Sequence, residues 1–172
     1  MDLVMFPNDI LKTKVAKANF SGELDLPQIA SEMVGLMHNN GGLGLAAPQV
    51  GHNVAMFVMR IITGSGGELM VVNPSITSRY GVRVGTEGCL SIPGVELSIR
   101  RHKSITLEGF TPEGEPIKHR LSGVEAVIAQ HEFDHLQGIL IFDRVSYSAR
   151  KKALEEYRRM REIDKMTFND EV

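Results

Sequence analysis

The stretch "SGVEAVIAQHEFDHLQG", residues 122–138, contains the signals that begin and end a helix. Ser122 and Glu125 have the spacing of a capping box at a helix N-terminus, and Gly138 is the residue type preferred just past a C-terminus. Within the stretch, two histidines stand four places apart, with a glutamate directly after the first. We therefore predict one helix here, carrying a histidine pair.

His131 and His135 project from nearly the same face of such a helix, because each residue turns by about 100°. Their imidazoles can therefore converge on one metal ion. The apolar residues that precede them on that face are Val124, Val127 and Ile128. Glu132, one step round the helix, would lie beside a bound metal and accept a proton from water, which is a hydrolytic arrangement. The alternative is that both histidines are ordinary buried side chains.

A catalytic site of the zinc type needs a third protein ligand and leaves one position for water. The long signature of one metalloprotease class would place another histidine three residues beyond Gly138, but Ile141 stands there, which excludes that class. Cys89 is the next candidate, because a thiolate is a strong ligand and the chain has no second cysteine to pair with it. The alternative for a lone cysteine is a small buried hydrophobic residue.

Cys89 lies in "EGCLSIP", residues 87–93, and a further unusual stretch, "GLGLAAPQVG", occupies residues 42–51. Together with "HEFDHLQG", residues 131–138, these blocks resemble those of bacterial-type peptide deformylases in order and spacing. The resemblance implies an α+β fold, in which mostly antiparallel β-sheets wrap around the metal-binding helix and a further helix ends the chain. It also implies hydrolysis of the N-formyl group from the formyl-methionine of nascent polypeptides, with release of formate.

The resemblance assigns roles to the side chains of the expected metal site. Cys89, His131 and His135 bind the metal, and water takes the fourth position. The metal lowers the pKa of this water, and Glu132 accepts its proton and later passes it to the departing amine.

Substrate contacts are implied by the same resemblance. The side-chain amide of Gln49 and the backbone N–H of Leu90 stabilise the charge that develops on the formyl oxygen. Gly42 and Gly44 let the backbone lie close to an extended peptide that pairs with this strand, although a tight turn would also explain them. The expected walls of a methionine pocket are Leu43, Val124, Val127 and Ile128. Each of these four is equally well explained as plain core.

Two acidic side chains are expected to support the site from outside it. Glu87 would hold the metal loop by pairing with Arg100 or Arg101. Asp134, on the far side of the helix from Glu132, is interpreted as structural support.

One departure from the family concerns the far end of the substrate. Many bacterial members carry a basic residue soon after the cysteine block, which grips the peptide backbone. This chain has Val95 and Glu96 there instead. How the distal end of the peptide is held is therefore open.

The ligand set alone does not select the metal, since two imidazoles and a thiolate admit iron, zinc, nickel or cobalt. The resemblance implies one ferrous ion per chain in the cell, with zinc replacing it after aerobic handling. Ferrous iron beside a thiolate oxidises readily, so a loss of activity in air is expected.

The composition fits a single globular domain over residues 1–172, with 42% hydrophobic and 23% charged residues. A formal charge of −2 is too close to neutral to suggest nucleic-acid binding by bulk charge. The N-terminal stretch lacks the features of a signal or transit peptide, and no apolar run approaches membrane-spanning length. We expect a cytoplasmic protein, with nothing that requires more than a monomer.

Further elements follow from periodicity and turn residues. A helix is expected over residues 26–40, and a C-terminal helix over residues 146–166 with Ser146 as its N-cap. Residues 167–172 are expected to form a flexible tail. The runs expected to form strands are residues 54–59, 69–73, 103–109 and 139–142.

Three functional alternatives stay open at this point. A zinc peptidase would use Glu155 as the third ligand in place of Cys89. A non-catalytic domain with a structural metal would normally need four protein ligands. The basic residues of the C-terminal helix make a contact with the ribosome or the nascent chain conceivable, whereas the interleaved Glu155 and Glu156 favour a solvated helix.

Overall fold

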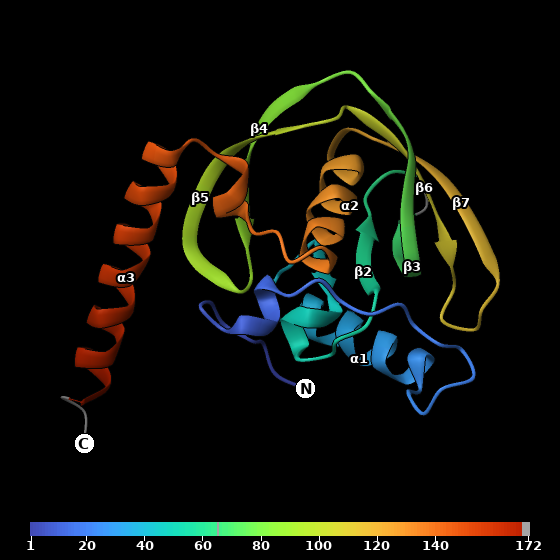
Figure 1. Ribbon diagram of the computed structural model, residues 1–172, viewed down its shortest axis with the longest axis horizontal. Coiled ribbons are helices and arrows are strands. Elements are labelled where there is room, and N and C mark those ends of the chain that lie inside the picture. Colours follow the sequence, from blue (N-terminus) through green and yellow to red (C-terminus); the bar gives the residue numbers. More distant parts are fainter. Residues whose placement is uncertain (65, 170–172) are drawn as a thin grey trace.

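The computed structural model describes residues 1–64 and 66–169, which form an α+β fold (Figure 1). Its helices are α1 (Leu26–Asn39), α2 (Gly123–Leu136) and α3 (Tyr147–Asn169), with short 3-10 turns η1 (Asp9–Lys12), η2 (Ala47–Val50) and η3 (Ile141–Arg144). Its strands are β1 (Gly44–Ala46), β2 (Met56–Ile61), β3 (Gly67–Tyr80), β4 (Arg83–Cys89), β5 (Ile92–Arg101), β6 (Ser104–Phe110) and β7 (Pro116–Ser122). None of the described helices combines the length and hydropathy needed to cross a membrane.

Two antiparallel sheets surround α2. Five strands pair in the order β1-β2-β3-β6-β7, and β4 pairs with β5 in a separate two-stranded sheet. Figure 1 shows α2 at the centre, with the β4–β5 sheet on one side and β2 and β3 on the other. The predicted fold class, antiparallel sheets around a central helix followed by a C-terminal helix, is confirmed.

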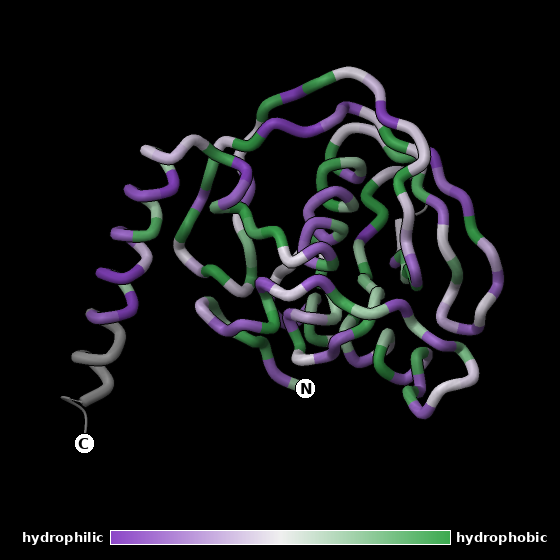
Figure 2. Tube along the Cα trace, viewed as in Figure 1, coloured by the Kyte–Doolittle hydropathy of each residue, from purple (hydrophilic) through white to green (hydrophobic). Residues whose placement is uncertain are grey.

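α2 is buried on several faces rather than on one. Ten of its 14 residues are buried, and the buried set includes both apolar and polar side chains. Ala126 and Ala129 are small enough to let the five-stranded sheet come close, and they pack with Phe57 and Leu107 in one core cluster. Figure 2 accordingly shows hydrophilic and hydrophobic residues alternating along this helix. Buried polar groups need hydrogen-bond partners or a metal ion, so the polar side chains of α2 are expected to have specific partners inside the fold.

The start of α2 differs from the prediction. Ser122 occupies the N-cap position, but its side chain makes no capping hydrogen bond, so the predicted capping box with Glu125 is wrong. Glu125 Oε1 instead accepts three hydrogen bonds of 2.8 Å, from the backbone N–H of Ile62 and from the N–H and hydroxyl of Thr63. Three donors from the loop after β2 therefore replace the one that the cap would have offered.

The end of α2 confirms one prediction and contradicts another. Gly138 follows the helix with φ +70°, as its expected role requires, and a Cβ there would lie 2.5 Å from the Lys12 carbonyl oxygen. Residues 139–142 do not form the predicted strand, because the chain turns into η3 with its apolar side chains buried. Periodicity cannot separate a buried turn from a strand in so short an apolar run.

The helix predicted over residues 26–40 and the strands predicted over 54–59, 69–73 and 103–109 correspond to α1, β2, β3 and β6. β4, β5 and β7 were not predicted. β4 contains Gly85 and Gly88, which are unfavourable in strands, and β7 alternates half-buried with exposed residues and has one buried side chain. Pairing with β5 and β6 therefore determines these strands more than their own composition does.

α3 packs on the domain through one narrow face (Figures 1 and 2). Ala153 and Tyr157 are buried, and the Tyr157 hydroxyl donates a 2.9 Å hydrogen bond to the Phe6 carbonyl oxygen. Ser146 Oγ accepts a long hydrogen bond of 3.4 Å from the N–H of Ala149, in line with its predicted capping role. The helix continues to Asn169, into the predicted tail, of which residues 170–172 lie outside the described part of the chain.

Candidate active site

The three expected metal ligands meet beside α2. Cys89 Sγ lies 3.3 Å from His135 Nε2, which lies 3.2 Å from His131 Nε2. All three donor atoms lie within 4.8 Å of one another, and no other His, Cys, Asp or Glu of the described residues joins them. Cys89 is the last residue of β4, so the two-stranded sheet brings the thiol to the histidine face of α2.

This donor set fits a tetrahedral metal ion with one position left open. Bonds of about 2.0–2.1 Å to nitrogen and about 2.3 Å to sulfur place the ligand atoms of such an ion roughly 3.3–3.6 Å apart. The observed separations of 3.2 and 3.3 Å come close to that spacing. Two imidazoles and one thiolate are ligands that suit iron, zinc, nickel or cobalt.

The two histidines differ in protonation before a metal binds. Burial lowers the pKa of His135 well below its usual value, which keeps this ring in the neutral form that a metal needs. Burial alone would also lower the pKa of His131, but hydrogen bonds with Cys89 and Glu87 raise it well above the usual value. Metal binding is therefore expected to release a proton from His131.

Glu87 holds His131 from outside the donor cluster. Glu87 Oε2 lies 3.0 Å from His131 Nδ1, which directs the Nε2 atom of that ring toward the other two ligands. Arg101 donates to both oxygens of Glu87, at 2.8 and 2.9 Å. Burial alone would raise the pKa of Glu87, but the hydrogen bonds from Arg101 and His131 outweigh it and lower the pKa to about 2. Glu87 is therefore a permanent anion at neutral pH.

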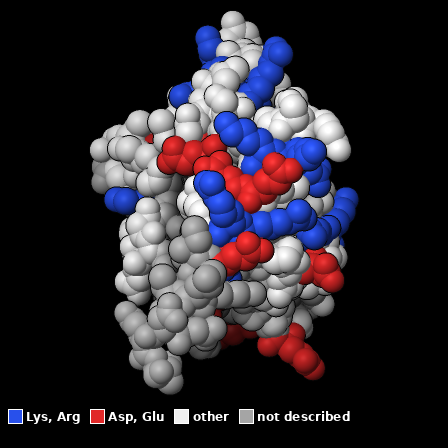
Figure 3. All heavy atoms as spheres, turned by 90° about the vertical axis from the view of Figure 1, so that its left-hand side faces the viewer, with Lys and Arg blue, Asp and Glu red and all other residues white. Residues whose placement is uncertain are grey.

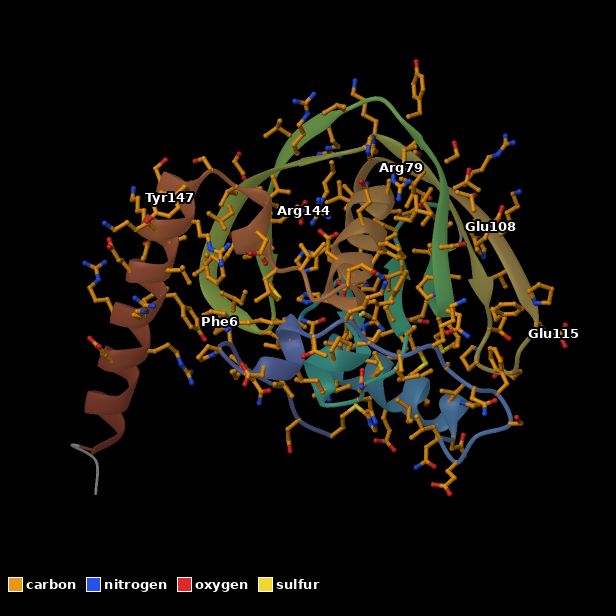
Figure 4. All side chains as sticks on the ribbon, viewed as in Figure 1. Phe6, Arg79, Glu108, Glu115, Arg144 and Tyr147 are labelled. Atoms are coloured by element: carbon orange, nitrogen blue, oxygen red, sulfur yellow. The ribbon has the colours of Figure 1, made fainter. Side chains whose placement is uncertain are left out.

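Arg101 is the partner of Glu87, and Arg100, the other candidate, is not. Neighbouring residues of a strand point to opposite faces, so Arg101 is buried on β5 while Arg100 is exposed. Arg101 also donates to Asp134 at 2.5 Å, and Arg144 of η3 makes two further hydrogen bonds with that carboxylate. Figure 4 shows Arg144 beside α2. Asp134 thus ties η3 and β5 to the metal helix, in agreement with its predicted supporting role.

A cavity of about 380 Å³ opens beside the metal ligands. Leu43 and Val124 are 40% and 48% exposed, so they form part of its rim and are not core. Val127 and Ile128 line the same cavity, and Ile128 is also buried in the core of the five-stranded sheet. The four residues expected at the methionine pocket therefore share one cavity with Cys89 and His131.

Gln49 is fully buried at the edge of the donor cluster. Its Oε1 accepts a 2.8 Å hydrogen bond from the N–H of Ala46, which orients the amide. Its Nε2 then points toward Cys89 Sγ at 3.5 Å and Ser91 Oγ at 3.2 Å. Leu90 lines the cavity directly after the cysteine. Ser91 was not predicted as a site residue, although its place in "EGCLSIP" was the available signal.

Comparisons with known proteins identify the family. The family model described as polypeptide deformylase matches residues 1–151. This chain belongs to the polypeptide deformylase family. Its members are metal-dependent hydrolases that remove the N-formyl group from nascent peptides, so the function inferred from the three sequence blocks is confirmed.

Individual deformylases match most of the chain. The peptide deformylase of Aquifex aeolicus is 34% identical over 164 residues, which is 92% of this chain and 95% of that protein. The chloroplastic peptide deformylase 1B of rice is 38% identical over 149 residues, but the match spans only 55% of the rice protein. The crystal structure of the Legionella pneumophila peptide deformylase superposes with a TM-score of 0.86 at 28% identity, covering 95% of this chain and 96% of that one.

The peptidase alternative has no support in this deformylase fold. Glu155, its proposed third ligand, lies on α3 with a side chain that is 62% exposed. Its carboxylate is 4.0 Å from the Lys151 ammonium and does not join the donor cluster. The described cluster contains three protein ligands, whereas a structural metal site normally has four.

Glu132 has the environment that a proton carrier of a deformylase needs. Its side chain is 3% exposed, and its Oε2 has no hydrogen-bond partner among the described residues. Burial raises the pKa of Glu132 to about 7, although the nearby charge of His131 acts in the opposite direction. The carboxyl can therefore both accept and release a proton near neutral pH.

Gly44 is required by a contact within the protein, whereas Gly42 is only favoured by one. A Cβ on Gly44 would lie 2.3 Å from Glu132 Oε1, and a Cβ on Gly42 would lie 2.7 Å from Leu90 Cδ1. The first contact is with a carboxyl group held in the buried site, and the second is with the end of a flexible side chain. A close approach of substrate to this strand, the role expected from the sequence, is compatible with these contacts. The contacts would favour glycine even without a substrate.

Proposed function

We propose that this enzyme deformylates N-formylmethionyl nascent peptides with Cys89, His131 and His135 as metal ligands and Glu132 as the proton carrier. One observation carries the proposal: three metal-binding atoms lie together, and two of their residues, Cys89 and His131, line one cavity with Glu132, a buried carboxyl group with a pKa of about 7. When bound, a divalent ion at these ligands supplies Lewis-acid activation of water and of the formyl carbonyl.

Glu132 would act twice in the reaction. As a carboxylate, it takes the proton from the attacking water, and as an acid it returns this proton to the departing amine of methionine. Both steps need a pKa near neutrality, which burial provides here. The unpaired Oε2 supports this role, because no side chain of the described residues competes for it.

Gln49 and Leu90 are proposed as the donors that stabilise charge on the formyl oxygen. The bond from Ala46 to Gln49 Oε1 leaves the NH₂ group of the amide directed to the ligand cluster. Donors fixed in advance need no reorganisation when charge develops. The backbone N–H of Leu90 follows the cysteine ligand directly, which would place a second donor at the same site.

The substrate would bind as an extra strand with its methionine in the cavity. β1 pairs with β2 and ends the five-stranded sheet as described, so its other edge can accept a peptide main chain. Leu43, Val124, Val127 and Ile128 offer apolar walls for the unbranched methionine side chain. Main-chain pairing reads no side chains, so residues beyond the methionine would be tolerated, and Val95 and Glu96 would not replace a basic grip on the backbone.

The metal is proposed to be ferrous iron, one ion per chain, with Zn²⁺, Ni²⁺ or Co²⁺ as possible replacements. A cysteine ligand next to ferrous iron makes the site sensitive to oxygen. Iron-loaded enzyme purified without oxygen should therefore lose activity in air. Zinc-loaded enzyme should have the same activity in air as without oxygen. Equal, stable activity of the iron-loaded enzyme in both atmospheres would contradict an iron site.

We further propose that the enzyme acts as a monomer in the cytoplasm, does not bind DNA directly, and meets the ribosome through α3. Figure 3 shows basic and acidic side chains close together on the face that carries α3, so a ribosome contact would rest on specific pairs rather than on bulk charge. Truncation of the chain before residue 150 tests the contact. Undiminished ribosome association of the truncated protein would rule it out.

Formate release from an N-formyl-methionyl peptide tests the proposed function. Wild type should release formate rapidly, whereas an unformylated peptide should not be cleaved. Cys89→Ala should lose both metal and activity, because two histidines alone hold the ion weakly. Glu155→Ala, which removes the ligand that a peptidase would need, should be as active as wild type. Retained metal and activity in Cys89→Ala would overturn the assignment.

A further inference from the structure

A second cavity, of about 300 Å³, lies on the side of α2 away from the metal ligands. Gln130, Phe133 and Gln137 of the helix line it, and these face away from His131 and His135. The charged groups that line it are four arginines and one carboxylate: Arg79, Arg100, Arg101, Arg144 and Asp134. Three separate elements, β3, β5 and η3, thus bring guanidinium groups to one hollow.

The positive charges of this cavity exceed the acidic groups that face them. Arg101 and Arg144 are paired with Asp134, and Arg101 also holds Glu87. The side chains of Arg79 and Arg100 make no hydrogen bond or ion pair with any other described residue. Figure 4 shows Arg79 near β3 and Arg144 on η3, and both residues line this hollow.

We propose that this cavity is a binding site for a phosphate-like dianion, either inorganic phosphate or the phosphate group of a small molecule. A dianion would balance the two charges of Arg79 and Arg100. The planar guanidinium group offers two parallel N–H donors, a geometry that matches two oxygens of a phosphate. A hollow of about 300 Å³ holds a phosphate and leaves room for a small substituent on it.

The position of the cavity links it to the stability of the metal helix. Arg101 forms part of its wall and at the same time holds Glu87, which orients His131. A dianion that binds the folded protein alone raises the melting temperature, and the stabilisation grows with the logarithm of one plus the ratio of ligand concentration to Kd. The site is independent of the proposed deformylation, because none of the catalytic residues contacts it.

Titration of the metal-loaded full chain with inorganic phosphate tests the proposal, with ionic strength held constant by sodium chloride. Calorimetry should give saturable binding in the millimolar range or tighter, and the melting temperature should rise with phosphate. In the double variant Arg79→Gln/Arg100→Gln, affinity should fall by at least about tenfold, because two charge-assisted contacts are lost. The pairs of Asp134 stay intact, so the variant should fold and keep its deformylase activity.

The matched control is Arg158→Gln/Arg159→Gln, which removes two exposed arginines from α3. This control should keep the wild-type affinity within about twofold. Absence of saturable binding in wild type, or equal binding in the two double variants, would overturn the proposal, and the latter result would also expose binding at the metal. A nucleoside monophosphate in place of inorganic phosphate separates the two sources, since tighter binding of the ester would identify a phosphorylated small molecule.

Discussion

The two sides of the metal helix treat buried carboxyl groups in opposite ways. On the side facing β5, arginines hold Glu87 and Asp134, and the pKa of Glu87 falls to about 2. On the side facing the cavity, Glu132 has an oxygen without a partner among the described residues, and burial raises its pKa to about 7. Because Glu87 and Glu132 are both less than 8% exposed, burial alone does not decide their charge. The partners decide it.

This difference separates two tasks within one helix. The charged side fixes the position of the ligands, since Arg101 holds Glu87 and Glu87 holds His131. On the other side, the proposed proton transfer requires a carboxyl group free of such partners, and Glu132 has one unpartnered oxygen and a pKa of about 7. Changes on the charged side should therefore affect stability first, and changes on the cavity side should affect catalysis first.

Glu132→Gln should have the largest effect on activity. The amide keeps the shape of the side chain but cannot carry the proton, so kcat should fall by about 10³-fold or more. Metal content should stay at the wild-type level, because Glu132 is not a member of the donor cluster. Glu125→Gln, on the same helix but bound to the loop at Thr63, is the control and should keep activity within about tenfold. Near-normal turnover in Glu132→Gln would remove the proton carrier from this site.

Arg101→Met should have the largest effect on stability. It leaves the buried Glu87 carboxylate without its arginine and removes one of the two arginine partners of Asp134. Breaking a buried ion pair in this way costs about 3–5 kcal/mol of unfolding free energy. Arg100→Met, one residue earlier on the exposed face of β5, should change the unfolding free energy by no more than about 0.5 kcal/mol. Urea unfolding of both variants in phosphate-free buffer measures the difference. Equal losses in the two variants would contradict the one-sided role of Arg101.

Glu87 and Glu132 should contribute opposite slopes to the dependence of stability on pH in the chelator-treated protein, in addition to the contributions of His131 and His135. Glu87 has a folded pKa of about 2 against the model value of 4.5, so its contribution is present above pH 4.5 and is lost as pH falls toward 2. Glu132 has a folded pKa of about 7, so stability falls as pH rises from 4.5 to 7. Each effect is on the order of 3 kcal/mol. Glu87→Gln should remove the first contribution and Glu132→Gln the second, as measured by urea unfolding at a series of pH values.

Gly44→Ala should reduce activity by about 10²-fold, because the added Cβ would displace the carboxyl group of Glu132 by roughly an ångström. The matched variant Gly42→Ala places its Cβ against the end of the Leu90 side chain, which can move aside. It should therefore lose much less activity. The values of kcat/KM for the two variants give the test, and equal losses would indicate that both glycines serve the approach of substrate instead.

The fold was predictable where local signals matched the tertiary environment. Residues 122–138 were correctly predicted to form a helix, and Gly138 was correctly placed at its end, because a positive φ is needed there. The capping box failed because loop donors at Ile62 and Thr63 bind Glu125. β4 and β7 were missed because their pairing partners, and not their own residues, determine them.

The cluster of Cys89, His131 and His135 was predictable because helical spacing and one cysteine nearly determine it. His131 and His135 follow from a four-residue interval, and the family blocks add Cys89. The choice between Arg100 and Arg101 could not be made, since it depends on which face of β5 is buried, and β5 was not predicted. The roles of Ser91 and Arg144 depend on contacts with Gln49 and Asp134, which lie 42 and 10 residues away in the chain.

Ser91→Ala should have the smallest effect among these changes, and it probes how firmly the cavity side is held. The variant removes one partner of the Gln49 amide and keeps the bond from Ala46. A loss of about one net hydrogen bond predicts a fall of roughly 2- to 10-fold in kcat with little change in KM. Ser98→Ala on the exposed face of β5 is the control and should match wild type. A loss near 10³-fold would mean that Gln49 is positioned as rigidly as Glu87, so that the two sides of α2 would differ in charge but not in rigidity.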